Sequence, residues 1–451
     1  MIWMLAYWVV LLIVLVVGAV GSTGKGGALT LAYFLGLSLI HVPGVLAFLN
    51  PLSPAPGRDV TAIGFQMTLL GMTAFVAAAV AASKRRRRRE PLGAAPSSRQ
   101  IAMFDRMGWR TFVLGVFSYF ILLPISGRIP SATSVVSAAA TTLIIGLWIR
   151  LYGAEQARDG RSTLTTLALL PVLPLSTLAV GGFIGFGVSW VLSVLSFLYV
   201  VSRRRFWFFV SAPFVVFLGL SLFVTYEGQR TGIRDVVWHQ HAGLEDRLER
   251  VSTLVTQFEM LDLNNEVQLD ALNDRLNQNA LVGAGVQRLR SGAVGLKYGG
   301  TISPLDLVPR AIWPDKPVVG GSLHVVSAFT GIPFDATTSV GIGSVLEFYM
   351  NFGTPGLIIG FAGLGFLLMR LDQAVMKSLG AGDIKALLRS AMPGLLLLQP
   401  GGSFLEIAVG VVAAIVAARL IGALPVFGLA TAKALGGGAR LDPATGATTP
   451  S

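Results

Sequence analysis

Long apolar windows without a charged residue recur along almost the whole chain, and they constrain its fold more than any other feature. A bilayer core about 30 Å thick needs about 20 consecutive apolar residues for each helix that crosses it. The sequence therefore predicts an all-α polytopic membrane protein with about 11 transmembrane helices, of which the window 387–399 is the weakest. The windows lie near 2–20, 28–49, 60–82, 111–126, 131–150, 163–180, 183–201, 206–226, 338–368, 387–399 and 404–424.

The positive charges predict the orientation of these helices. Basic residues gather in alternate connections, whereas the other short connections hold only Arg58 and Arg128. Since cytoplasmic loops carry the excess of Lys and Arg, the basic connections are expected in the cytoplasm, and the formal charge of +12 reflects topology rather than nucleic-acid binding. The N-terminus is then expected outside and the C-terminus in the cytoplasm. The basic connections hold Lys84 to Arg89, Arg150 to Arg161, Arg203 to Arg205, and Arg370 to Arg389.

One long segment differs from the rest of the chain. From Glu227 to Asp335 it has thirteen acidic and ten basic residues, and the predicted topology places it outside. We expect a transmembrane bundle over 1–226, an extracytoplasmic loop over 227–337, a second bundle over 338–424, and a disordered cytoplasmic tail over 425–451, whose composition is too poor in large apolar residues to pack.

The outer segment contains two amphipathic patterns. Apolar residues recur at spacings of three and four, which predicts helices with one apolar stripe each. We interpret them as loop helices packed on the bundle, with a partner-binding or lipid-surface role as the alternative. The stripes are Leu244, Leu248, Val251, Val255 and Phe258, then Leu269, Leu272 and Leu276.

The stretch Pro309 to Pro317 reads Pro-Arg-Ala-Ile-Trp-Pro-Asp-Lys-Pro. Its three prolines exclude a regular helix and predict a stiff strap at the membrane surface. The strap would hold Arg310 and Lys316 in defined directions, and Trp313 would anchor it at the headgroup level. A structural loop with snorkelling cations is the alternative.

A second stretch, Glu347 to Gly353, reads Glu-Phe-Tyr-Met-Asn-Phe-Gly and opens a long apolar window. Gly356 and Gly360, spaced four apart behind it, predict close helix packing. An ionisable Glu347 in the outer part of the membrane is costly, and it is therefore a functional candidate, with a plain salt bridge as the alternative.

Together these two stretches resemble the O-antigen and exopolysaccharide repeat-unit polymerases of the Wzy type. The resemblance covers about 309–356, and the many helices with one large outer loop agree with it. It implies a bacterial inner-membrane glycosyltransferase that joins oligosaccharide repeat units carried on undecaprenyl pyrophosphate. A chain-length regulator and a flippase are the partners to expect, besides membrane lipids. The stretch Gln399 to Ser403 departs from relatives that carry an arginine there.

The chemistry suggests roles for the candidate residues. Arginine and lysine can stabilise a pyrophosphate leaving group, so Arg310 and Lys316 are the first candidates, with Arg230, Arg288 and Arg290 as further substrate-binding cations. His324 and Glu347 are the candidate bases for the acceptor hydroxyl. The His239-x-His241 pair lacks the further ligands that a metal site needs, so neither a metal nor another cofactor is predicted.

Two other functions remain open at this point. A transporter or flippase needs charged groups near the bilayer midplane, and these are sparse in the sequence; Glu406 is one such acid. An attachment ligase that moves a finished glycan to another acceptor would share both the architecture and the chemistry.

Overall fold

A computed structural model describes residues 1–20, 26–49, 57–86, 98–127, 129, 132–203, 205–239, 243–301, 308, 312–313, 322–334 and 340–425. The predicted cytoplasmic tail 425–451 lies outside these residues apart from its first position. Helices make up almost all of the described chain, and no strand occurs in it. The prediction of an all-α polytopic membrane protein is confirmed, because ten helical stretches are long and apolar enough to cross a bilayer.

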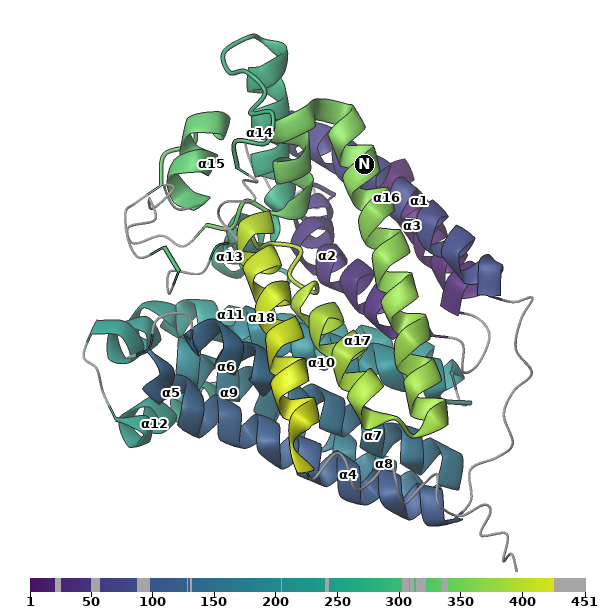
Figure 1. Cartoon of the computed structure of the whole chain (residues 1–451). Coiled ribbons are helices and arrows are strands. Elements are labelled where there is room, and N and C mark those ends of the chain that lie inside the picture. Colours follow the sequence, from purple (N-terminus) through teal and green to yellow (C-terminus); the bar gives the residue numbers. More distant parts are fainter. Residues whose placement is uncertain are drawn as a thin grey trace, which may run out of the picture.

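The helices follow one another along the chain, and the longest connection runs from Arg290 at the end of α14 to Ser322 at the start of α15 (Figure 1). They are α1 (Ile2–Leu15), α2 (Ala28–Ala47), α3 (Arg58–Arg86), α4 (Ser98–Phe117), α5 (Leu123–Ser126), α6 (Ala132–Ala140), α7 (Thr142–Ala157), α8 (Gly160–Leu167), α9 (Val172–Gly181), α10 (Ile184–Val201), α11 (Phe206–Arg234), α12 (Leu244–Thr256), α13 (Glu266–Leu276), α14 (Gln278–Arg290), α15 (Ser322–Thr330), α16 (Ser344–Ala381), α17 (Ile384–Leu396) and α18 (Phe404–Ala423). Three π-helical turns, Val16–Val20, Ser118–Leu122 and Asp235–His239, extend α1, α4 and α11.

The eleventh predicted span is shorter than expected. The window 387–399 corresponds to α17, whose 13 residues rise about 20 Å and fall short of a bilayer core. Irregular backbone follows from 397 to 403 and is largely buried in protein. Such backbone is tolerated at membrane depth only where the protein covers it, so α17 and this connection act as one buried unit.

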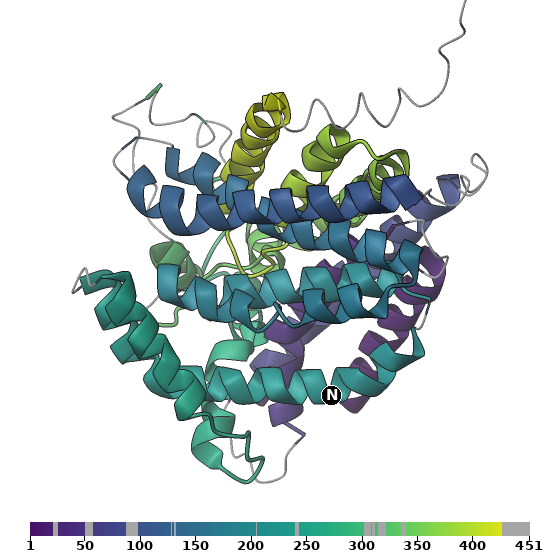
Figure 2. The same ribbon diagram turned by 90° about the horizontal axis from the view of Figure 1, so that it is seen from below.

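Two groups of helices cross each other (Figure 1). The helices α1, α2, α3 and α16 run steeply in that view, whereas α4 and α7 to α11 lie across them. Seen from below, the helices of the second group run roughly side by side (Figure 2). Small residues allow the closest contacts within and between these helices, because a Cβ on Gly115 would overlap Leu143 of α7, and one on Gly365 would overlap the carbonyl group of Phe75 in α3.

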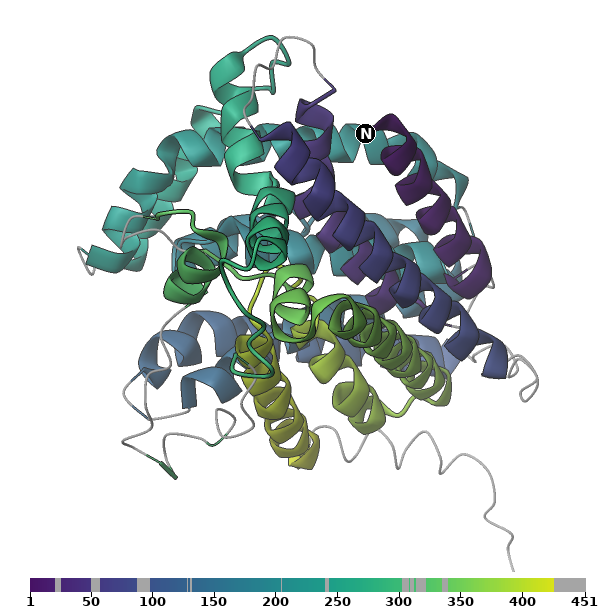
Figure 3. The ribbon, with the colours of Figure 1, turned by 90° about the horizontal axis from the view of Figure 1, so that it is seen from above.

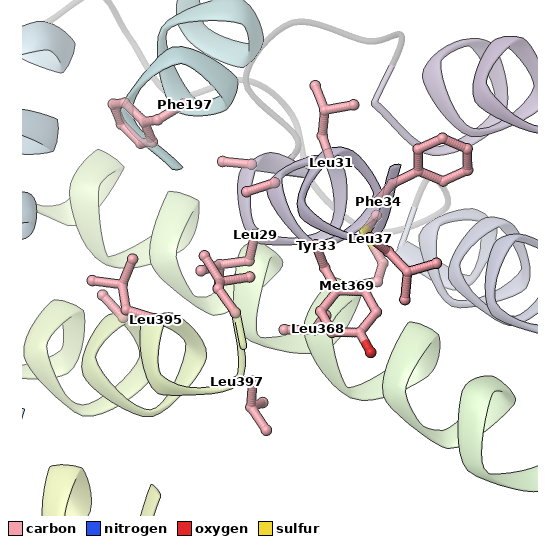
Figure 4. Close-up of a cluster of buried hydrophobic side chains, with 14 of the residues drawn as sticks. Leu29, Leu31, Tyr33, Phe34, Leu37, Phe197, Leu368, Met369, Leu395 and Leu397 are labelled. Carbon is pink, nitrogen blue, oxygen red and sulfur yellow. The ribbon is translucent and has the colours of Figure 1, made fainter. Parts of the chain in front are cut away.

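The main core lies around α2 (Figure 4). Leu29, Tyr33, Phe34 and Leu37 are buried along it. Side chains from α10, α16 and α17 complete the cluster, among them Phe197, Leu368, Met369, Leu395 and Leu397. Because α2 is covered on so many sides, it is the central helix of the described bundle.

Among the described residues, three charged side chains are buried inside helices rather than placed in connections: Arg150, Asp372 and Glu347, the last of which belongs to the site below. Arg150, predicted in a basic cytoplasmic connection, lies within α7, donates to Asp105 at 2.7 Å and stacks over the Trp109 ring at 4.1 Å. Asp372 of α16 accepts hydrogen bonds from the Leu29 and Thr30 amides at 2.8 and 3.0 Å. It therefore caps the N-terminus of α2 from a distant helix, which stabilises the carboxylate and satisfies free amides.

Helix ends that are predicted to lie on the same side of the membrane also lie near one another in the structure, as expected for a chain that crosses a membrane repeatedly. Gly26 lies against Asp372, Gly382 lies near Met103, and Gly422 lies near Lys385, so the ends predicted to be cytoplasmic meet on one side. Which side faces the cytoplasm stays a prediction from the charges.

The orientation can be tested with single cysteines, because the chain has none of its own. We expect Ser291→Cys, exposed after α14, to react with a membrane-impermeant maleimide added outside intact cells. Gly160→Cys, exposed at the first position of α8, should react only after the cells are permeabilised. Both should label fully in detergent, and the reverse accessibility would overturn the predicted topology.

Candidate functional site

The helix α16 reverses its direction near its beginning (Figure 1). Phe352 and Gly353 have non-helical backbone angles and separate a short arm, residues 344–351, from a long arm, residues 354–381. The Phe348 and Phe361 ring centroids lie 5.8 Å apart, whereas thirteen residues of a continuous helix would separate them by about 20 Å. The two arms therefore pack antiparallel, and the predicted single helix over 338–368 is a helical hairpin.

Glycines make the reversal possible. Gly353 has φ 61° and ψ −152°, a conformation that is open to glycine and costly for residues with a Cβ. Side chains on Gly356 and Gly360 would overlap Phe352 and Phe348 respectively, so their absence lets the arms approach. The predicted close packing at these two glycines is confirmed. The surfaces that it brings together are the two arms of α16 rather than two separate helices.

The outer turn that follows α14 caps the end of the short arm. The Lys297 and Tyr298 amides donate to the carbonyl oxygens of Met350 and Asn351 at 2.9 and 3.0 Å. Asn351 is fully buried, accepts from the Gly299 amide at 3.0 Å and donates to the Thr301 hydroxyl at 2.6 Å. Carbonyls at a helix end need such partners, so the turn 297–301 fixes where the short arm ends.

The beginning of the short arm is held from three directions. The Ser344 amide donates to the Pro400 carbonyl oxygen at 2.9 Å, and Tyr33 of α2 donates to the Ser344 hydroxyl at 3.2 Å. Gln278, the first residue of α14, contacts Gly343 and lies near Gly401. The first residues of α14, α16 and α18 thus converge on the connection 397–403.

Glu347 lies on the short arm at this junction and is 1% exposed. Its Oε2 accepts a hydrogen bond from the Phe404 amide, the first residue of α18. Its Oε1 is buried and has no hydrogen-bond partner among the described residues, and no cation of the described chain forms an ion pair with it. The positive end of the α18 dipole and the nearby Thr301 hydroxyl stabilise the carboxylate, while Oε1 makes no hydrogen bond of full geometry with the described residues.

A small cavity of about 30 Å³ adjoins this carboxylate. Its walls are largely apolar, and Tyr33, Ser344 and Glu347 are the lining residues with polar side-chain groups. Both arms of α16 and the first turn of α18 contribute to the lining. Its lining residues are Tyr33, Ser344, Glu347, Phe348, Leu364, Leu397, Phe404 and Ile407.

The helix α14 penetrates the bundle beside the short arm, although the sequence predicted no helix there. Figure 3 shows it alongside α3. Cβ atoms on Gly64 and Gly283 would overlap the carbonyls of Asn279 and Val60, so the two backbones touch. Asn279 is fully buried, lies with its Oδ1 2.6 Å from Nδ1 of His41 and donates to the His41 carbonyl oxygen at 2.7 Å. This buried polar pair anchors α14 to α2.

Three of the predicted residues lie on α14 and α15, and one of them, Arg288, lies near the short arm. Gly285 of α14 faces Leu346, and Arg288 lies one turn further along the helix, against Gly331 at the end of α15. Its Nε is buried without a partner among the described residues. Arg290 and His324 are both exposed, on α14 and α15 respectively. The structure therefore brings Arg288 within a helical turn of the arm that carries Glu347, and places His324 on a neighbouring surface helix.

The other predicted residues are placed differently. Arg230 lies on α11, where it pairs with Glu227 at 2.9 Å, and Glu227 also pairs with Arg275 of α13 at 2.9 Å. This network ties α13 to α11 and lies outside the Glu347 junction. Trp313 is 37% exposed. Arg310 and Lys316 lie outside the described residues, so their roles stay predictions.

The sequence pattern did not point to several residues of this junction. No sequence motif surrounds Tyr33, Gln278 or Thr301. Their place in the junction becomes visible only from their contacts in the folded structure. Asn351 stands four residues after Glu347, a spacing that puts both on one face of a helix, and that signal was available. Within the described residues, no group of three or more His, Asp or Glu side chains could hold a metal ion.

Comparisons with known proteins add no relative. No protein-family model, no curated protein and no solved structure matches the chain.

The role of Asn351 can be tested through stability. We expect Asn351→Ala to lower the free energy of unfolding by about 1–3 kcal/mol, because the buried Gly299 amide and Thr301 hydroxyl lose their partner. The measurement is thermal unfolding of the purified protein in detergent. Asn264→Ala, at an exposed position in the outer segment, should change stability by less than about 0.5 kcal/mol, and equal effects of the two variants would contradict the capping role.

Proposed function

We propose that the chain is a repeat-unit polymerase that extends undecaprenyl-pyrophosphate-linked oligosaccharides on the outer face of the bacterial inner membrane. One observation carries the proposal beyond the resemblance: the buried Glu347 carboxylate keeps one unpartnered oxygen beside a cavity with apolar walls. A buried carboxylate without a full set of partners is costly, and such groups are characteristic of functional sites.

In this proposal Glu347 is the general base. The acceptor hydroxyl of a fresh lipid-linked unit attacks the anomeric carbon at the reducing end of the growing glycan, and Glu347 Oε1 takes its proton. The bond from that carbon to the pyrophosphate breaks, and its electron pair leaves with undecaprenyl pyrophosphate. The Phe404 amide holds the other carboxylate oxygen and orients the group.

The cations of the outer segment stabilise the leaving group in the same proposal. Arg310 and Lys316 occupy the strap positions of the family that the chain resembles. Arg288 is a described cation that can assist them, because its buried Nε has no partner among the described residues and it lies one turn beyond Gly285, which contacts the short arm. Guanidinium groups suit phosphate oxygens because they can donate two parallel hydrogen bonds.

A transporter of lipid-linked glycans is the second candidate. The reversal within α16 favours it, because discontinuous helices with buried polar groups form the substrate sites of many transporters. An attachment ligase would use the same site chemistry. The three candidates differ in product: a polymer on the lipid carrier, an unchanged lipid-linked unit on the opposite leaflet, or a glycan on another acceptor.

The strap can be tested in cells that make the polymer. We expect Arg310→Ala and Lys316→Ala to reduce polymer by about 10²-fold or more, while the level of membrane protein stays near that of the wild type. Arg310→Lys should keep part of the activity, because it retains the charge and loses the two-pronged geometry. Parallel loss of protein and polymer would assign the strap a structural role.

Glu347 can be tested by chain extension in vitro, with purified protein in detergent and lipid-linked repeat units. Glu347→Gln should be almost inactive, because the amide can still accept from Phe404 but cannot take a proton, and Glu347→Asp should be weakly active. Glu266→Gln is the matched control, since it removes an exposed carboxylate from the first turn of α13, away from the Glu347 junction, and should extend chains normally. Full activity of Glu347→Gln would remove this residue from the chemistry, and absence of extension by the wild type would favour the transporter.

A further inference from the structure

Large apolar side chains are exposed on the outer segment where α12 ends and α13 begins. Within residues 255–267, which we call the outer wedge, Val255, Met260, Leu263 and Val267 are each more than 60% exposed. The predicted stripe of α12 is wrong at this end, because Val251 and Leu254 face the protein while Val255 and Phe258 face outward. Such a cluster on a protein surface marks an interaction site.

The outer wedge is fixed to the middle of α11 rather than to its outer end. The Leu261 amide donates to the Ser221 hydroxyl at 3.0 Å, and the Glu259 amide donates to the Thr225 hydroxyl at 3.1 Å. Leu261 is buried and packs in one cluster with Val224. The segment between α12 and α13 is therefore held along the side of a membrane-spanning helix.

The depth of the outer wedge follows from the geometry of α11. The basic residues up to Arg205 are expected at the cytoplasmic boundary, and Phe206 begins the helix. Ser221 is then about 22 Å and Thr225 about 28 Å along the axis, both less than the roughly 30 Å of a bilayer core. Membrane-spanning helices tilt by up to about 40°, and at that tilt Ser221 and Thr225 still lie about 17 and 21 Å from the cytoplasmic boundary, beyond the bilayer midplane. The outer wedge is therefore level with the outer leaflet.

The lipid-facing surface of α11 continues into this cluster. Phe214 and Val216 on α11 are about 60% exposed within an apolar window that spans the membrane. The hydrogen bonds of Ser221 and Thr225 join the outer wedge to the next turns of the same helix. The exposed Glu259 and Asp262 alternate with the apolar residues and suit the boundary between headgroups and hydrocarbon.

We propose that residues 255–267 insert into the outer leaflet of the bilayer, with Met260 and Leu263 in contact with acyl chains. The insertion anchors the outer segment to the membrane independently of the strap. A second copy of the chain or another protein would not require the cluster to lie at this depth, whereas the neighbouring surface of α11 is exposed and apolar within a window long enough to cross a bilayer.

Single-cysteine labelling tests the insertion. Met260→Cys and Leu263→Cys would each be labelled with the environment-sensitive fluorophore NBD, in phosphatidylcholine nanodiscs with and without lipid carrying a nitroxide on the upper acyl chain. We expect blue-shifted emission that the nitroxide lipid quenches, as for the reference Phe214→Cys. Asp274→Cys, exposed on α13, is the matched control and should give a water-like, weakly quenched spectrum.

Two results would overturn the proposal. A water-like spectrum at both positions would show that the outer wedge lies above the membrane. A blue shift that nitroxide lipids do not quench would show that protein covers it, and a dependence on the number of copies per nanodisc would identify a second copy as the partner. The labelling is independent of the proposed polymerase activity, so either conclusion can fail without the other.

Discussion

The reversal of α16 at Phe352 and Gly353 is the constraint on which the rest of the junction depends. Breaking a helix inside a membrane protein frees carbonyls and amides that lipid cannot satisfy, so protein groups must reach them. The turn 297–301 supplies amides to the end of the short arm, and the Pro400 carbonyl receives the amide at its beginning. The turn after α14 and the irregular connection 397–403 therefore both supply partners to the ends of the short arm.

Buried charges in this bundle are satisfied in two ways. Arg150 has an ion pair and an aromatic ring, and Asp372 has the free amides of α2, so both are compensated within the protein. Glu347 differs, because a helix amide holds one oxygen while the other has no partner among the described residues. Full compensation is typical of structural charges, and incomplete compensation is the physical reason to assign Glu347 a chemical role.

The outer segment is not a loop that merely connects two membrane-spanning helices, because its own helices pack against the bundle. One part, α14, enters the bundle and touches α2, α3 and the short arm of α16, while α12 and α13 lie along α11. The site is therefore built from elements on both sides of the predicted domain boundaries. Changes in the outer segment can reach Glu347 through Gln278 and the turn 297–301, since both contact the short arm or its flanking glycine.

The sequence by itself determined the all-α membrane fold and most helix positions, and it singled out Glu347 as a candidate, because hydrophobic length, charge placement and the cost of an ionisable residue in the membrane are local properties. It also indicated the glycines that pack helices. Only the tertiary structure decided that Glu347 lies on a reversed arm, that Asn279 pairs with His41, and that Val255 faces outward. These outcomes depend on which segments meet, and a chain of similar apolar windows does not specify its neighbours through periodicity alone.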